Sequence, residues 1–167
     1  YMPSWHEYEK PGEFYAGKSS LGGGVVLTEI HEIDILSWFF DSTKKVMAMG
    51  GTLGPYALDV EDTVGVILEC ESGGRKFPVS LMMSFVQNPP TRRLVVNGAE
   101  GRLILELPRF TLTHVLSDGT IGECFQLPEN FDRNNFYINE LAHFIQCLEE
   151  GVKPLTSLPE ILTGEKV

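Results

Sequence analysis

TVGVILECESGGRKFPVSLMMSF spans residues 63–85 and decides the fold of this chain. In 63–70, and again in 77–85, every second residue is apolar, which is the period of a strand with one buried face. Ser72-Gly73-Gly74 between the two runs is a turn sequence, and so short a connection joins antiparallel strands. The stretch therefore predicts a β-hairpin within an antiparallel sheet.

The same alternation continues on both sides of this hairpin. Strands are predicted at 45–49, 93–97, 102–107 and 110–116, with turn sequences at Asn88-Pro89-Pro90, Asn97-Gly98 and Asp118-Gly119. Helices are predicted at 25–40, which is apolar on most sides, and at 134–150, whose apolar stripe ends before a C-cap at Gly151. We expect an α+β fold in a single domain over residues 1–167: an open, mostly antiparallel β-sheet of about six strands, with helices packed on one face.

The two predicted faces of the sheet differ less in polarity than those of a sheet with one face in water. The expected outer face carries Ile67, Met82, Ile104, Met47 and Met49 among Thr63, Ser80 and Ser84. A solvated face is normally more polar. We therefore expect a second protein surface to cover it, with a monomer that leaves an apolar face exposed as the alternative.

The acidic composition excludes several classes of partner. The net charge is −10, from 23 acidic and 13 basic residues, and adjacent basic residues are few, as at 44–45 and 92–93, so nucleic acid is not an expected partner. No apolar run is long enough to span a bilayer, so no membrane partner is expected either.

The cysteines, Cys70, Cys124 and Cys147, are widely spaced and predict reduced thiols in a cytoplasmic protein.

The predicted helix 25–40 carries the strongest chemical signal. Thr28, His31 and Asp34 are three residues apart and form one polar row, whereas Glu29 and Glu32 are expected on other faces. Asp34 could fix the tautomer of His31 and raise its basicity, as in a catalytic pair. The alternative is a His–Asp pair that only satisfies itself beneath a loop.

The triglycine at 22–24, just before this helix, allows two interpretations. It could bring the backbone close to a ligand at the helix N-terminus, or it could be an ordinary entry loop. It follows no strand, so it lacks the context of a dinucleotide-binding turn. A metallohydrolase that uses His6, His31, His114 and His143 is a further alternative, but these residues lack the spacing of metal ligands, and we expect no metal.

The run LGGGVVLTEIHEID (21–34), followed by Trp38-Phe39-Phe40, resembles the signature of the glucose-fructose oxidoreductase / inositol dehydrogenase (GFO/IDH/MocA) family. MPSWH (2–6), ALDVEDT (57–63) and NGAEGRL (97–103) fit it too, and the resemblance covers about residues 1–160. It implies a C-terminal substrate-binding and dimerisation domain that follows a Rossmann domain absent from this chain. The whole protein would oxidise a hydroxyl of a sugar, cyclitol or nucleotide sugar with NAD or NADP, bound mainly by that other domain, and the isolated chain would be inactive.

The resemblance also implies roles for individual residues. His31 would be the proton acceptor, with Asp34 as its catalytic companion, while Thr28, Trp5 and His6 would lie near the substrate; for Trp5, a packing role is the alternative. Many members have Asp where this chain has Thr28, which keeps open a non-catalytic binding or dimerisation module of the same fold. The resemblance implies a homodimer, or a dimer of dimers, through the open sheet face.

Overall fold

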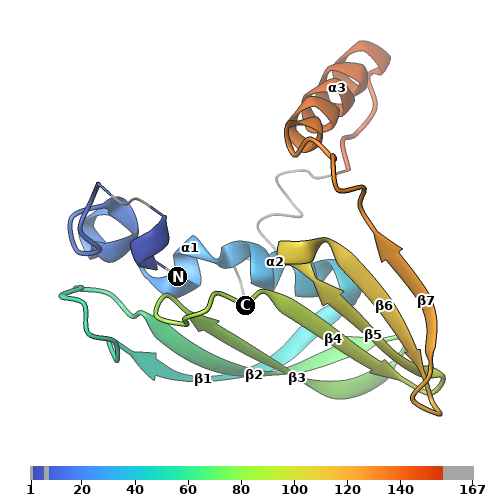
Figure 1. The fold of residues 1–167 in the computed structure, drawn as a ribbon, viewed down its shortest axis with the longest axis horizontal. Coiled ribbons are helices and arrows are strands. Elements are labelled where there is room, and N and C mark those ends of the chain that lie inside the picture. Colours follow the sequence, from blue (N-terminus) through green and yellow to red (C-terminus); the bar gives the residue numbers. More distant parts are fainter. Residues whose placement is uncertain (1, 6–7, 156–167) are drawn as a thin grey trace. The chain divides into compact units, whose positions relative to one another are not determined.

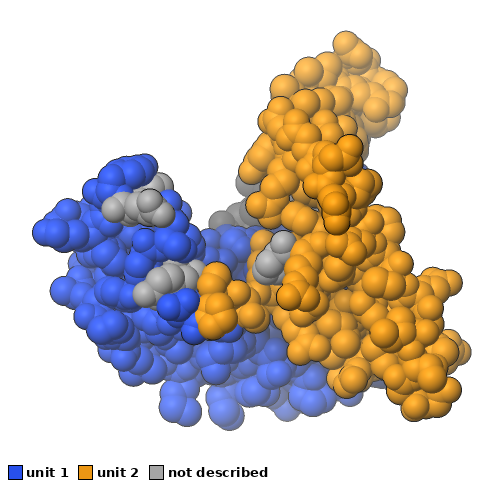
Figure 2. Space-filling view, viewed as in Figure 1, with its two compact units in different colours: residues 1–88, 155–167 blue, residues 89–154 orange. Residues whose placement is uncertain are grey.

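The computed structural model describes residues 2–5 and 8–155 of the chain. The chain divides into two compact units, residues 1–88 with 155–167 and residues 89–154, which Figure 2 shows in blue and orange. Within the described residues, no helix is both long and apolar enough to cross a bilayer.

The first unit is built on a three-stranded antiparallel sheet. Its strands are β1 (Ser42–Gly51), β2 (Thr63–Ser72) and β3 (Arg75–Ser84), in the order β1-β2-β3. Gly73 and Gly74 join β2 to β3 with φ of 56° and 75°, a left-handed conformation that glycine adopts without strain. The predicted hairpin is therefore confirmed.

Two helices, α1 (Val25–Thr28) and α2 (Ile30–Phe39), cover one face of this sheet (Figure 1). Val25 and Leu36 pack there against alternate residues of β2, from Val64 to Cys70, and all of these side chains are buried. Each buried aliphatic side chain of this size stabilises the fold by roughly 1.5–3 kcal/mol. The period-two pattern thus identified the inner face correctly.

The opposite face of the same sheet is apolar and open to solvent. Met49 is 83% exposed, Met82 is 68% exposed, and Met47 and Ile67 are exposed beside them. Met47 is paired with Ile67, and Gly65 with both Met49 and Met82, so these side chains form adjacent rows across all three strands. The predicted apolar outer face is confirmed for this sheet.

The N-terminal segment packs onto the same core through short 3₁₀ turns at Met2–Ser4, Tyr15–Gly17 and Ser19–Leu21. The backbone N–H of Met2 donates to the carbonyl of Phe85 at 2.9 Å, and the side chain of Met2 is buried. This places the segment at the end of the sheet, next to the start of α1 (Figure 1).

The second unit holds a four-stranded antiparallel sheet. Its strands are β4 (Arg93–Gly98), β5 (Gly101–Glu106), β6 (Thr111–Leu116) and β7 (Ile121–Gln126), in the order β4-β5-β6-β7. The α+β class and the antiparallel pairing are confirmed. The described strands form two hydrogen-bonded sheets of three and four strands, where a single sheet of about six was expected.

Two local features explain that difference. Pro89 and Pro90 stand between β3 and β4 and have no N–H to donate to a ladder, so the chain leaves the first sheet before it starts the second. Strand β7 was not predicted because its side chains are exposed on both faces and show no alternation. The turn sequence Asp118-Gly119 could have predicted this strand, since a hairpin turn requires a strand on each side.

Helix α3 (Asn134–Glu150) has the predicted bounds, and Gly151 caps it with a φ of 65° and a hydrogen bond to the carbonyl of Cys147. Its start is anchored by the ring of Phe136, whose centre lies 5.7 Å from that of Phe110 and 5.0 Å from that of Phe131. The apolar stripe is exposed at Tyr137, Leu141, Phe144, Ile145 and Leu148. Helices α1 and α2 therefore pack on a sheet face as expected, whereas the apolar stripe of α3 is exposed.

Candidate functional site

Glycines 23 and 24, just before α1, lie close to other parts of the same chain. A Cβ on Gly23 would lie 2.5 Å from the carbonyl oxygen of Tyr15 and 2.6 Å from that of Ala16. Gly24 has a φ of 110°, and a Cβ there would lie 2.5 Å from a carboxylate oxygen of Glu61. A side chain at position 23 would therefore meet backbone atoms, and one at position 24 would be strained by the positive φ.

The carboxylate of Glu61 occupies the N-terminus of α1. Its Oε1 accepts a hydrogen bond from the backbone N–H of Val26 at 3.1 Å, and its backbone carbonyl accepts one from Val25 at 3.0 Å. A negative charge is stabilised at this end of a helix. Of the two interpretations of the triglycine, the structure supports the entry loop, because the carboxylate of Glu61 already occupies the place that a ligand would take at the helix N-terminus.

Other acidic residues of the same loop tie down further segments. Asp59 accepts hydrogen bonds from the backbone N–H and the hydroxyl of Ser19 at 2.8 and 2.9 Å, and these bonds lower the pKa of its carboxyl group. Asp62 is fully buried and accepts hydrogen bonds from the backbone N–H groups of residues 53–54 at 3.0 and 2.8 Å. Together with Glu61, these carboxylates hold the loops that frame α1.

The predicted helix 25–40 is interrupted at one residue. Glu29 separates α1 from α2 with φ and ψ of −99° and 28°, outside the helical range. Its N–H caps α1 by donating to the carbonyl of Val25, and its own carbonyl accepts from Glu32 at the start of α2. The regular period therefore does not carry from the residues before Glu29 to those after it.

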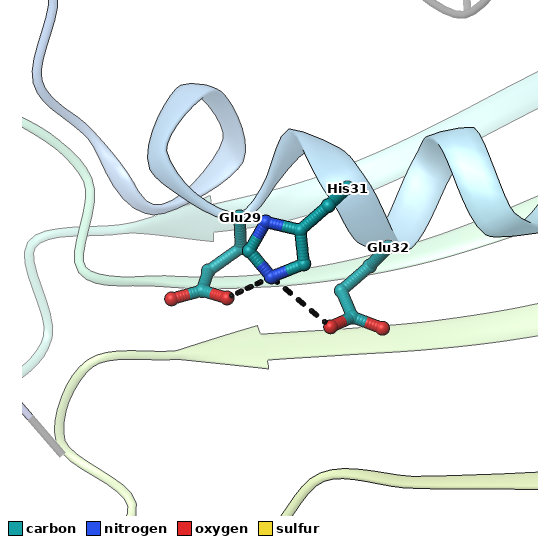
Figure 3. A group of neighbouring side chains, drawn as sticks. All are labelled: Glu29, His31 and Glu32. Atoms are coloured by element: carbon teal, nitrogen blue, oxygen red, sulfur yellow. Dashed lines mark ion pairs between the residues drawn. The ribbon is translucent and has the colours of Figure 1, made fainter. Parts of the chain in front are cut away.

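His31 lies between two glutamates (Figure 3). Its Nε2 is 2.9 Å from Oε2 of Glu29 and 3.4 Å from Oε1 of Glu32, and its side chain is 45% exposed. The expectation that these glutamates lie on other faces is wrong. The break at Glu29 and the length of the glutamate side chain explain why: both carboxylates reach around the helix to the imidazole.

Thr28, His31 and Asp34, the polar row expected from the spacing, do not form hydrogen bonds or ion pairs with one another in the described structure. Asp34 is exposed and makes no ion pair with any described residue, so the expected His31–Asp34 pair is absent. The hydroxyl of Thr28 is buried and has no hydrogen-bond partner within the described chain. A catalytic role for Asp34 and a substrate contact for Thr28 stay predictions.

Trp5 packs on the core of the first unit. Its ring meets those of Phe14 and Phe85 edge-on, with centres 6.3 and 5.3 Å apart, while part of it is exposed. Such contacts support the packing role. His6, the other predicted substrate contact in this segment, lies outside the described residues.

Glu29, His31 and Glu32 are also the described side chains whose ligand atoms lie close enough to share a metal ion, within 4.8 Å of one another. The two ion pairs explain the cluster without an ion. Of the other histidines named for the metallohydrolase alternative, His114 lies on β6, and His143 contacts Sγ of Cys147 one turn along α3, with Nε2 at 3.6 Å.

Several solved structures share this fold. A UDP-N-acetylglucosamine 3-dehydrogenase from Acidithiobacillus ferrooxidans has a TM-score of 0.69 at 16% identity, over 87% of this chain and 44% of its own. Biliverdin reductase from Synechocystis, solved with biliverdin and NADP+, has 0.67 at 15% identity, over 93% and 47%. A super-repressor mutant of Gal80p from Saccharomyces cerevisiae has 0.66 at 21% identity, over 87% and 42%. This chain spans less than half the length of each.

At these identities the structural likeness shows the fold alone. No curated protein matches the sequence. The family model described as the GFO/IDH/MocA C-terminal domain matches residues 1–104, which is more than half of the 167 residues. The chain therefore belongs to the GFO/IDH/MocA family, as the C-terminal domain of an oxidoreductase-family protein.

Proposed function

We propose that residues 1–167 form the substrate-binding and dimerisation domain of an NAD(P)-dependent oxidoreductase that oxidises a hydroxyl of a sugar, cyclitol or nucleotide sugar. The single observation that carries the proposal is the half-exposed imidazole of His31, held between two carboxylates. An imidazole in that setting can accept a proton and stay charged. Family membership and the likeness to a nucleotide-sugar dehydrogenase support the substrate class.

The main cofactor site is proposed to lie on a companion domain. The triglycine packs against its own loop, and the adjacent carboxylate of Glu61 would repel a pyrophosphate at the helix N-terminus. When bound by a companion domain, NAD or NADP would supply the hydride acceptor. The part of this chain is to orient the hydroxyl and to take its proton at His31, so the chain alone is expected to be inactive.

Several side chains are proposed to orient the substrate. Asp34 projects from α2 into solvent and can accept hydrogen bonds from sugar hydroxyls. Trp5 offers the exposed part of its ring to the C–H face of a sugar while the rest packs on Phe85. The family resemblance supports Thr28 and His6 as further substrate contacts.

The exposed sheet face is the proposed dimer interface. Met47, Met49, Ile67 and Met82 form a continuous apolar surface, which in a stable assembly would be covered by a second copy of this chain. A twofold axis over this face would place the same rows against each other. We propose a homodimer, or a dimer of dimers, on this basis.

Activity assays on the protein that joins this chain to its companion domain test the proposal. With NAD or NADP and a panel of sugars, cyclitols and nucleotide sugars, His31→Ala should lower kcat by about 10²–10⁴-fold, the usual contribution of a positioned base. His114→Ala, on β6 in the other unit, is the matched control and should leave kcat unchanged. Equal kcat for the His31→Ala variant and the unaltered protein would refute the assignment.

A non-catalytic binding module is the second candidate. It is favoured by the structural likeness to Gal80p, described as a super-repressor mutant, and by Thr28 at a position where many family members carry an acid. A protein of this class would show no nicotinamide-linked turnover of any substrate in the panel. It would still dimerise through the methionine-rich face.

We also propose a cytoplasmic location. All three cysteines are free thiols, and Cys124 is exposed, where an oxidising compartment would modify it. Trapping of thiols in fractionated cells would show Cys124 reduced if this is correct.

A further inference from the structure

We propose that Glu29 is the positioning residue of His31 and takes the place of the carboxylate that position 28 lacks. This inference rests on the proposed function of His31 as proton acceptor. It concerns a residue that the helical period assigned to a different face. The break in the helix is what makes the assignment possible.

Thr28 is unsuited to the role. Its hydroxyl is buried, makes no hydrogen bond to any described residue and carries no charge that could balance an imidazolium. Asp34, the other acid on the predicted row, is exposed and has no ion pair in the described part of the chain. Neither of the two neighbours expected from the spacing therefore holds the ring.

Glu29 lies close enough to His31 to hold its ring. Its Oε2 is 2.9 Å from Nε2 of His31, the length of a charge-assisted hydrogen bond. Glu32 is farther away, at 3.4 Å, which is near the limit for a hydrogen bond. Because Glu29 has non-helical torsions, its side chain leaves the backbone in a direction that a continuous helix would not give it. Of the two glutamates, Glu29 is therefore the closer to the His31 ring.

This contact sets the chemistry of the ring. A carboxylate 2.9 Å from Nε2 favours a hydrogen on that nitrogen, so we infer that the neutral imidazole carries its hydrogen on Nε2 and its lone pair on Nδ1. A bound oxidised nicotinamide would supply the acceptor for the hydride from the C–H bond, while Nδ1 of His31 would take the proton of the O–H bond as the carbonyl forms. Glu29 then stabilises the imidazolium without taking a proton itself.

The first experiment needs no enzyme activity. Nitrogen-15 NMR of the His31 ring in this chain should show the hydrogen on Nε2 of the neutral form. In Glu29→Gln, which preserves shape, the two tautomers should become mixed, whereas Glu32→Gln should have a smaller effect and Asp34→Asn none. Backbone spectra of each variant confirm that it is folded. An unchanged ring in Glu29→Gln, or a changed ring in Asp34→Asn, would overturn the inference.

The second experiment measures kinetics in the protein that includes the companion domain. Glu29→Gln should lower kcat by about tenfold or more at unchanged KM, and Glu29→Asp should recover part of it, since a positioning effect acts on the transition state. If His31→Ala abolishes turnover but Glu29→Gln does not reduce kcat, the inference fails and the proposed function stands. If no turnover depends on His31 while the NMR pairing is present, the proposed function fails, and so does any catalytic role for the pair.

Discussion

Asp62 should be among the most costly polar residues of the first unit to replace. Its side chain is fully buried at the start of β2, and its two oxygens accept hydrogen bonds from the backbone N–H groups of residues 53–54. Its own backbone pairs with Gly51 and Phe85. The carboxylate thus closes the long connection between β1 and β2 against the core.

The size of the effect follows from these two bonds. A hydrogen bond to a charged group contributes about 1.5–3 kcal/mol, so the pair contributes about 3–6 kcal/mol. Leu53 is exposed, which lets water reach the N–H groups that a truncation would free, and this favours the lower end of the range. We expect Asp62→Ala to lower the free energy of unfolding by about 3 kcal/mol. Asp62→Asn, which keeps one acceptor oxygen, should cost about half as much.

Urea unfolding followed by tryptophan fluorescence measures this directly, because both tryptophans, Trp5 and Trp38, lie in the first unit. Asp41→Asn is the matched control, since Asp41 also accepts a backbone hydrogen bond, from Gly73 at 2.9 Å, but is exposed. It should cost no more than about 1 kcal/mol. If Asp62→Ala and Asp41→Asn shift the unfolding midpoint equally at the same slope, the buried carboxylate does not act as described.

Three further predictions test other parts of the structure. Ser19→Ala removes a hydrogen-bond donor to Asp59 and should raise the pKa of that carboxyl toward its ordinary value in an NMR titration; an unchanged pKa would contradict this. Because the folded pKa is lowered, the contribution of Asp59 to stability is present above the unfolded pKa and is lost as the pH falls through the folded pKa. Met82→Lys should convert the proposed dimer to a monomer in light scattering at equal concentration, and a monomeric unaltered protein would disprove the interface. Gly24→Ala should destabilise the chain by about 1–3 kcal/mol, more than Gly22→Ala, because Gly24 has φ and ψ of 110° and 148° beside the Glu61 carboxylate, whereas Gly22 is left-handed with no neighbour within 4 Å; equal losses would contradict this.

Much of the fold could be predicted because its signals are local. The hairpin of β2 and β3 follows from alternation and a diglycine turn, and the bounds of α3 follow from an apolar stripe and a C-capping glycine. The exposed row of Met47, Met49 and Met82 could be anticipated in the same way, since side chains two residues apart share a face of a strand. In each case neighbours along the chain determine the outcome.

The site could be predicted only in part. His31 was identified because an imidazole on an apolar helix requires a partner, but the partner was assigned to Asp34 by assuming an unbroken helical period. That period is interrupted at Glu29, where the torsions leave the helical range. A single such residue changes which side chains meet, and no propensity of the run 28–34 indicates it.

Six of the seven described strands, helix α3, the apolar sheet face and the family could be predicted from the sequence, because each depends on residue type at regular spacing or on a recognisable run. Tertiary structure alone decided that the carboxylate of Glu61 fills the end of α1, that Glu29 interrupts the helix, and that His31 therefore faces two glutamates. These contacts depend on loops brought together by folding and on torsions at single residues. Neither leaves a period in the sequence.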